Sequence, residues 1–262
     1  MILAAREAGS GTPLVLLHGL FGASDNFGRV QRRLAGRFRT IALDLRNHGA
    51  SPHAPGMDYA TLAADVIETL DARAALPAVL VGHSMGGKAA MMAALTAPEA
   101  VARLVVVDVA PVRNPPGFRA IAAAMQALPL TPGLTRREAG AVLSQAVPDD
   151  RVRAFLLQNL RPGDAPSWRI GLDRIVAALP DIEGWDPPPG ACYGGPTLFI
   201  AGGLSPYVTQ EARPAIRALF PKARVLTLKG VGHWVHADDP EGFLFAVDAF
   251  AGRTGERNDH AD

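Results

Sequence analysis

Two patterns of apolar and polar positions alternate along the chain. Short continuous apolar runs end in glycine or polar residues, as strands buried in a parallel sheet do. Between them, apolar residues recur three or four positions apart, which is typical of helices with one buried face. The strand-like runs are 13–19, 38–45, 78–84, 101–111, 196–203 and 223–230. The helix-like runs are 26–36, 59–73, 86–97, 209–220 and 240–252.

This alternation predicts an α/β fold, with a mostly parallel sheet covered by helices on both faces. It breaks between Val112 and Gly195, where helix-like patches are separated by Pro and Gly and no convincing strand appears. We therefore expect a core domain formed by residues 1–111 and 195–262, and a helical cap of residues 112–194 inserted before the last two strands. An insertion at this point is expected to lie above the strand ends, where ligands bind.

Length and composition limit the class of protein. The 262 residues are 48% hydrophobic, which is ample for a buried core, and the net charge of +1 predicts no nucleic-acid partner. The single cysteine, Cys192, rules out an intramolecular disulfide and a cysteine-rich metal site, and we expect it to be a small buried hydrophobe. Arg6 and Glu7 argue against a signal peptide, and no apolar run is long enough to cross a bilayer. A soluble cytoplasmic protein without membrane insertion is the expectation.

The strongest chemical signal is the sequence Gly82-His83-Ser84-Met85-Gly86. It is a G-x-S-x-G motif placed between a strand-like and a helix-like run. Such a turn holds a serine in a strained conformation and projects its hydroxyl from the sheet. Side chains in place of the glycines would collide with the neighbouring strand and helix. Ser84 is therefore a candidate nucleophile, and the alternative is a serine that only caps the helix.

A serine nucleophile needs a base. Among the seven histidines, His233 and His236 follow the last strand and reach the same end of the sheet as Ser84. The Gly-His context favours His233, although a purely structural histidine there stays possible. We expect His18 to make structural hydrogen bonds and His83 to point away from the serine hydroxyl.

The chain resembles the α/β-hydrolase superfamily over nearly its whole length. The motifs that carry the resemblance are "HGLFGASDNF", "DLRNHGASP", "GHSMGGKAAM", "VVDVAP" and "GHWVHAD". Together they are similar to the bacterial YbfF-type esterases and their mitochondrial relatives, the ABHD11-like hydrolases. The resemblance implies hydrolysis of esters or thioesters without a cofactor, and some members prefer short acyl groups.

Acyl transfer also needs donors for the developing oxyanion. The first is the N–H of Met85, which follows the nucleophile. The second should come from the loop after "LLHG". The resemblance implies Leu20, with Phe21 as the alternative.

The chain departs from the superfamily at the acid. Most members carry it in the loop after the strand that follows the cap, where this chain reads "IAGGLSPYVT" without a carboxylate. Asp108 ends the strand that follows the nucleophile helix, and parallel strands bring it to the same edge as Ser84. The resemblance to the YbfF-type enzymes implies the acid at this position, so Asp108 is the candidate acid and Ser205 the next candidate. The other aspartates considered have structural interpretations: Asp44 in a loop, Asp65 on a helix surface, Asp238 and Asp239 at the start of the last helix.

These residues predict a serine hydrolase that cleaves ester or thioester bonds of small acyl substrates through an acyl-enzyme. No cofactor or metal site is expected. The residues expected to line the substrate pocket are Phe21, Phe118, Met125, Phe155, Leu156 and Trp168. The alternatives are a noncatalytic ligand-binding protein of the same fold, or a peptidase, lactonase or perhydrolase using the same triad. The physiological substrate, acyl-chain length, leaving group and oligomeric state stay open.

Overall fold

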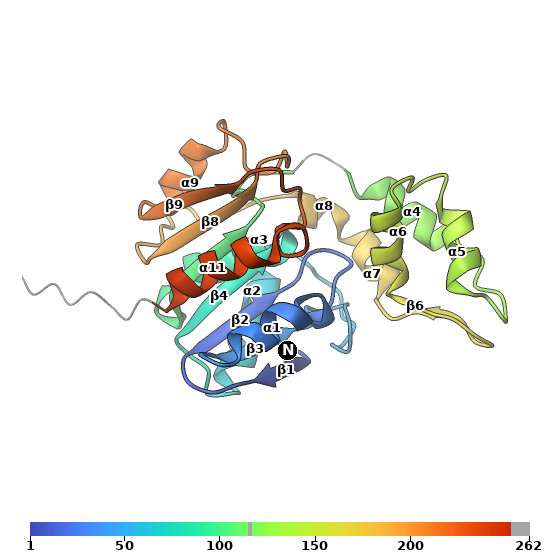
Figure 1. Ribbon diagram of the computed structural model, residues 1–262, viewed down its shortest axis with the longest axis horizontal. Coiled ribbons are helices and arrows are strands. Elements are labelled where there is room, and N and C mark those ends of the chain that lie inside the picture. Colours follow the sequence, from blue (N-terminus) through green and yellow to red (C-terminus); the bar gives the residue numbers. More distant parts are fainter. Residues whose placement is uncertain (115–116, 253–262) are drawn as a thin grey trace, which may run out of the picture.

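Seven strands form one sheet in the computed structural model, which describes residues 1–114 and 117–252 (Figure 1). The order across the sheet is β1-β3-β2-β4-β5-β8-β9. Within this sheet, as far as the structure describes it, only β1 runs antiparallel to its neighbour, and the other pairings are parallel. The strands are β1 (Ala5–Ala8), β2 (Pro13–Leu17), β3 (Arg39–Leu43), β4 (Ala78–His83), β5 (Val101–Val107), β8 (Thr197–Gly202) and β9 (Ala223–Leu228).

The first strand was not predicted from the sequence. Its residues, Ala5–Ala8, are partly exposed along their whole length, so they lack the apolar run that marks the other strands. The strand forms because its backbone pairs with β3 at the edge of the sheet, where one face of side chains can stay in water.

Helices cover both faces of the sheet. On one face, α1 (Gly28–Leu34) and α11 (Pro240–Ala251) pack against a core that includes Phe27, Val81 and Phe243. On the other, α2 (Tyr59–Asp71), α3 (Met85–Thr96) and α9 (Arg213–Leu219) contribute to a second core that includes Leu80. All six residues of β4 are buried, since the sheet is covered on both sides of this central strand. Short helical turns complete the core domain: η1 (Ser24–Phe27), η2 (Pro98–Ala100) and α10 (Val235–Asp238).

The chain between β5 and β8 forms a helical segment that lies beside the sheet (Figure 1). Thr135 and Asp149 cap two of its helices by accepting backbone N–H groups. A two-residue pairing of Leu160–Arg161 with Ser167–Trp168 was not predicted, because it is too short to show a period. The elements are α4 (Arg119–Ala127), α5 (Arg136–Leu143), α6 (Asp150–Leu157), β6 (Leu160–Arg161), β7 (Ser167–Trp168), α7 (Leu172–Ala177) and α8 (Leu179–Glu183).

Two buried side chains of the core domain fasten the end of this segment. The Tyr59 hydroxyl donates to the carbonyl of Ile182 at 2.6 Å, and Lys88 Nζ donates to the carbonyl of Gly184 at 2.9 Å. Burial lowers the pKa of Lys88 to about 7. Because Lys88 lies on α3, the same helix that follows Ser84 anchors the returning end of the insertion.

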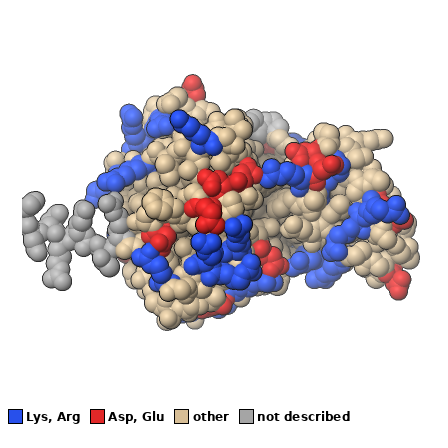
Figure 2. Space-filling view, in the orientation of Figure 1, with Lys and Arg blue, Asp and Glu red and all other residues tan. Residues whose placement is uncertain are grey.

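The surface mixes both signs of charge. Figure 2 shows basic and acidic side chains next to one another on the face it presents, as in the pairs of Arg29 and Arg33 with Glu241 at 3.0 and 3.2 Å. Over the residues that the structure covers, none of the helices is both long and apolar enough to cross a membrane.

The prediction that Cys192 is buried was wrong. Its side chain is exposed, because the neighbouring Tyr193 takes the buried place and donates its hydroxyl hydrogen to the carbonyl of Val101 at 2.8 Å.

Candidate active site

Ser84 occupies the turn between β4 and α3 in a strained conformation. Its φ is 53° and its ψ is −118°, in a region that side-chain-bearing residues rarely adopt. The N–H of Ser84 donates to the carbonyl of Val107 at 3.0 Å. The carbonyl of Ser84 accepts the N–H of Lys88, also at 3.0 Å. The strain is therefore held by backbone hydrogen bonds on both sides.

The glycines around Ser84 are required by close backbone contacts, as the sequence predicted. A Cβ at Gly82 would collide with the carbonyl of Gly86, and a Cβ at Gly86 would collide with the carbonyls of Leu17 and His18. One added at Gly87 would lie 2.8 Å from a Val109 methyl carbon. The helix can approach the sheet this closely only without side chains at these positions.

His233 and Asp108 form the hydrogen-bonded pair that the candidate triad needs. Nδ1–H of His233 donates to Asp108 Oδ2 at 2.7 Å, and the Asp108 side chain is fully buried. The N–H of Gly202 donates to Asp108 Oδ1 at 2.8 Å, and the Ser205 hydroxyl donates to Oδ2. Ser205 stands in the loop after β8, and it fixes the carboxylate that follows the neighbouring strand, β5.

Aromatic rings enclose the His233 imidazole. The Tyr207 ring lies 4.4 Å from it and the His83 ring 4.7 Å, measured between centroids. His83 Nε2–H donates to the carbonyl of His233 at 2.9 Å, so this ring supports the loop. Burial holds the pKa of His83 well below its ordinary value, so it stays neutral beside His233.

His18 and His48 use both ring nitrogens in backbone hydrogen bonds. His18 Nδ1–H donates to the carbonyl of Gly19 at 2.8 Å, and Nε2 accepts the N–H of Leu45 at 2.9 Å. The structural role expected for His18 is confirmed. His48 Nδ1–H donates to the carbonyl of Arg46 at 2.9 Å, and burial lowers its pKa to about 3.

The backbone N–H groups considered as oxyanion donors, those of Leu20, Met85 and the alternative Phe21, differ in whether they already donate a hydrogen bond. The Phe21 N–H donates to His48 Nε2 at 3.1 Å and is therefore occupied. Within residues 1–114 and 117–252, no partner is recorded for the N–H of Leu20 or of Met85. Gly19 lies directly against Ser84, since a Cβ on Gly19 would be 3.3 Å from Ser84 Cβ.

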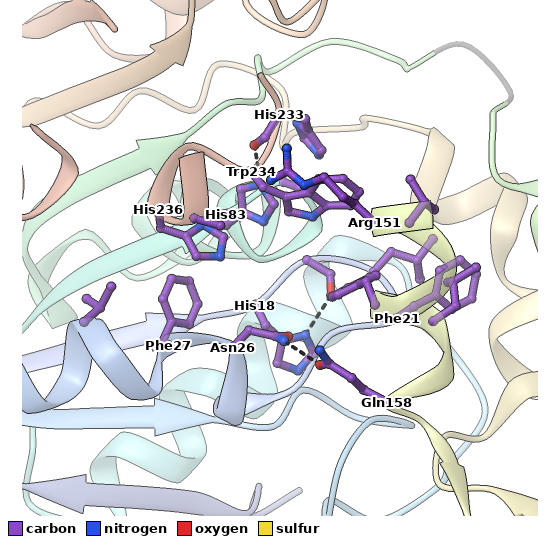
Figure 3. A pocket seen from close by; sticks show the side chains of 18 of the residues that line it. His18, Phe21, Asn26, Phe27, His83, Arg151, Gln158, His233, Trp234 and His236 are labelled. Atoms are coloured by element: carbon purple, nitrogen blue, oxygen red, sulfur yellow. Dashed lines mark hydrogen bonds between the residues drawn. The ribbon is translucent and has the colours of Figure 1, made fainter. Parts of the chain in front are cut away.

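Ser84 and His233 line one cavity of about 380 Å³ between the core domain and the inserted segment (Figure 3). Among the residues expected to line it, Phe21, Phe118, Phe155 and Leu156 do so. A polar contact closes one side, where Asn26 Nδ2 donates to Gln158 Oε1 at 3.3 Å. No hydrogen bond joins Ser84 Oγ to the His233 ring among the contacts of the described atoms.

Two residues expected at the pocket lie elsewhere. Met125 is fully buried on α4, the helix that packs against α7, and Trp168 packs against the small core of the inserted segment. The sequence placed both residues in the inserted segment, but it could not show which of that segment's side chains meet the cavity. No cluster of His, Cys, Asp or Glu suited to hold a metal ion occurs in the described part of the chain.

The other aspartates have mixed outcomes. Asp44 accepts the backbone N–H groups of Ser24 and Ala50, as expected of a loop residue. The surface position expected for Asp65 was wrong, because it is buried in a two-bond ion pair with Arg46.

At the last helix, Asp239 caps α11 by accepting the N–H of Gly242 at 2.9 Å, as predicted. Asp238 instead accepts the N–H of Gly232 at 3.0 Å and pairs with Arg151 at 2.5 Å. It therefore supports the loop that carries His233.

Known proteins match this architecture over most of the chain. The model of the alpha/beta hydrolase fold family matches residues 12–240. The sn-1-specific diacylglycerol lipase ABHD11 of Mus musculus is 42% identical over 246 residues, covering 90% of this chain and 80% of that protein. Esterase YbfF of Escherichia coli (strain K12) is 39% identical over 244 residues, covering 93% and 94%. The solved structure of a marine microorganism esterase is 34% identical with a TM-score of 0.92, covering 95% of this chain and 99% of that one. The predicted fold class and family resemblance are confirmed.

Substituting Gly86 should destabilise the whole fold. Gly86→Ala places a methyl group against two strand carbonyls, and overpacking of this kind costs roughly 1–3 kcal/mol or more. We expect a clear loss in the urea midpoint of unfolding. Gly36→Ala is the matched control, because no atom lies within 4 Å of the added Cβ. Equal midpoints for the two variants would contradict the close-approach argument.

His236 should make the protein labile in acid. Burial lowers its pKa from 6.5 to about 4, so the folded state keeps the ring neutral while the unfolded state takes up a proton. The associated stability is fully present above about pH 6.5 and is lost as the pH falls toward 4.

In His236→Leu, the free energy of unfolding should fall less steeply between these pH values, by roughly 1.4 kcal/mol per pH unit. Urea titrations at several pH values measure this slope. His53→Leu, at an exposed position, should leave the slope as in the wild type. An unchanged slope in His236→Leu would refute the assignment.

Proposed function

The chain belongs to the alpha/beta hydrolase family, and from this premise we propose that it is a serine hydrolase. It cleaves carboxylic ester or thioester bonds of small acyl substrates through an acyl-enzyme. The observation that carries the proposal is the shared cavity in which the strained Ser84 faces the same space as the His233–Asp108 pair. Relatives named as an esterase and as a diacylglycerol lipase support ester cleavage.

In the first half-reaction, His233 Nε2 takes the proton of Ser84 Oγ while the oxygen attacks the acyl carbon. The bond to Asp108 holds the proton of the imidazole on Nδ1, which leaves the Nε2 lone pair free. The protonated His233 then gives its proton to the departing alkoxide or thiolate. Hydrogen bonds between nucleophile and base often shorten only when substrate is bound.

In the second half-reaction, His233 takes a proton from water, which attacks the acyl carbon and releases the acid. Ser84 Oγ recovers its proton from the same ring. In both halves, the negative charge on the former carbonyl oxygen is stabilised by the N–H groups of Leu20 and Met85.

Asp108 acts as the negative charge beside the imidazolium. Its carboxylate is kept in place by the N–H of Gly202, the last residue of β8, and by the hydroxyl of Ser205 in the loop that follows. We assign Ser205 a positioning role, since it donates to the oxygen that also accepts from His233. The acid thus follows β5, and the groups that hydrogen-bond to it come from the end of the neighbouring strand, β8.

The acyl chain occupies the apolar part of the cavity. Phe118, Phe155 and Leu156 come from the inserted segment, and Phe21 comes from the core domain. Residues 112–194 therefore act as a cap that excludes water from the acyl-enzyme. A cytoplasmic location and the absence of nucleic-acid partners stay predictions.

Ser84→Ala distinguishes an enzyme from a noncatalytic binding protein of the same fold. The wild type should react covalently with a fluorophosphonate probe, and Ser84→Ala should not. Hydrolysis of p-nitrophenyl butanoate should fall on the order of 10³-fold or more, leaving the rate due to binding and oxyanion stabilisation. A variant that hydrolyses the ester at near the wild-type rate would exclude Ser84 as the nucleophile.

Asp108→Asn tests the acid with little change in shape. The amide favours the wrong imidazole tautomer and removes the charge beside the imidazolium, so kcat should fall on the order of 10³–10⁴-fold. Asp239→Asn is the matched control, because asparagine caps a helix as well as aspartate does. A kcat ratio near unity between the two variants would remove Asp108 from the triad.

A further inference from the structure

The turn that carries the Leu20 N–H is held by hydrogen bonds at nearly every peptide group. The N–H of Gly22 donates to the carbonyl of Gly19 at 2.9 Å, which closes the turn. Phe21 lies within it at a φ of 60°, a left-handed conformation that is unfavourable for a residue with a side chain. Its N–H donates to His48 Nε2 at 3.1 Å. Of the N–H groups of residues 20–22, only that of Leu20 has no partner in the described structure.

The carbonyl of Phe21 is held by the inserted segment. Asn159, which follows α6, donates from Nδ2 to this oxygen at 2.7 Å across 138 positions of sequence. The residue is 3% exposed, so water does not compete for the bond. Its own backbone is fixed, because its N–H donates to Leu156 at 3.1 Å and its carbonyl accepts from Arg169 at 2.8 Å.

The side chain of Phe21 also packs against the inserted segment. The rings of Phe21 and Phe118 meet edge to face with centroids 6.5 Å apart. Phe21 is therefore held from three directions: by His48 at its N–H, by Asn159 at its carbonyl and by Phe118 at its ring. Figure 3 shows Phe21 on the side of the cavity next to the insertion.

From this geometry we infer that Asn159 is a positioning residue for the oxyanion site. The inference rests on the proposed function. The bond from Asn159 keeps Phe21 in its left-handed conformation, and this fixes the direction of the preceding Leu20 N–H. Oxyanion donors stabilise a transition state only when they are oriented beforehand. The site is therefore complete only while residues around Asn159 are seated against the core domain.

Asn159→Leu and Asn159→Asp both remove the donor with little change in size. Each should lower kcat for p-nitrophenyl butanoate on the order of tenfold with KM nearly unchanged, since the interaction lost is made in the transition state. This loss is smaller than the roughly 100- to 1,000-fold that follows removal of an oxyanion donor itself. The inhibition constant of an alkyl trifluoromethyl ketone, which forms a charged adduct with the serine, should rise by the same factor as kcat/KM falls.

Arg136→Met is the matched control for loosening of the insertion. Its guanidinium donates to the carbonyls of Leu157 and Leu160, on either side of Asn159, and among the described residues it makes no hydrogen bond to Phe21. It should lower the Tm without changing the ratio of the ketone inhibition constant to KM. A Tm measured for every variant identifies misfolded protein, and whichever Asn159 variant folds decides the question.

Three outcomes overturn the inference: a kcat within twofold of the wild type in a folded Asn159 variant, a rise in KM at constant kcat, or the same ratio change in Arg136→Met. The proposed function is tested separately: hydrolysis retained by Ser84→Ala would refute it, and that variant can be measured in the same assay.

Discussion

The contact between α3 and the carboxyl end of β2 leaves no room for a side chain at Gly86, and the geometry of the site depends on it. Because the helix begins so close to the sheet, the chain must turn sharply at Ser84, at a φ of 53°. Met85 is the first residue of that helix, where backbone N–H groups have no intrahelical partner. Left-handed backbone recurs at Phe21 and Asp108, with φ of 60° and 52°, at the ends of β2 and β5. Strained residues after three of the strands thus lie at one edge of the sheet, where dense packing on both faces can hold them.

Burial of neighbouring histidines keeps positive charge away from the candidate base. His83 lies against the His233 ring, and its depressed pKa means that it carries no charge beside that ring. His236 lies 4.9 Å from His83 and is neutral for the same reason. The fully buried Asp108 is then the nearest formal charge to the imidazole, at 2.7 Å, and its attraction is weakly screened in a site of low dielectric constant.

The sequence predicted those features of the fold and the site that depend on residues close together along the chain. The apolar runs identified the strands β2 to β5, β8 and β9, and the glycine pattern around Ser84 identified the turn, because both depend on residues close along the chain. Contacts between distant segments had no such local signal, and the pair of Asp108 and His233 was expected from strand topology and family resemblance instead. Asp65 was expected on the surface because a helical pattern does not show that Arg46 folds over it, and nothing near Asn159 indicates that its amide reaches Phe21. Only Ser205 had a detectable clue, its place in the loop where related chains carry the acid.

The position of the candidate acid, Asp108, shows how two adjacent strands can contribute to one site. β5 and β8 pair in parallel, with Val107 beside Ile200, so their ends deliver Asp108 and the loop of Ser205 to the same point. The N–H of Asp108 donates to the carbonyl of Ile200 at 2.9 Å, which fixes the carboxylate at the start of its own loop. A carboxylate from either strand end could therefore meet His233 Nδ1, and the other strand end would supply hydrogen bonds to it. The helical insertion leaves the sheet between these two strands, so the segment that covers the cavity starts and returns beside the acid. This connectivity explains how the cap can be large without displacing the pair on which the proposed base depends.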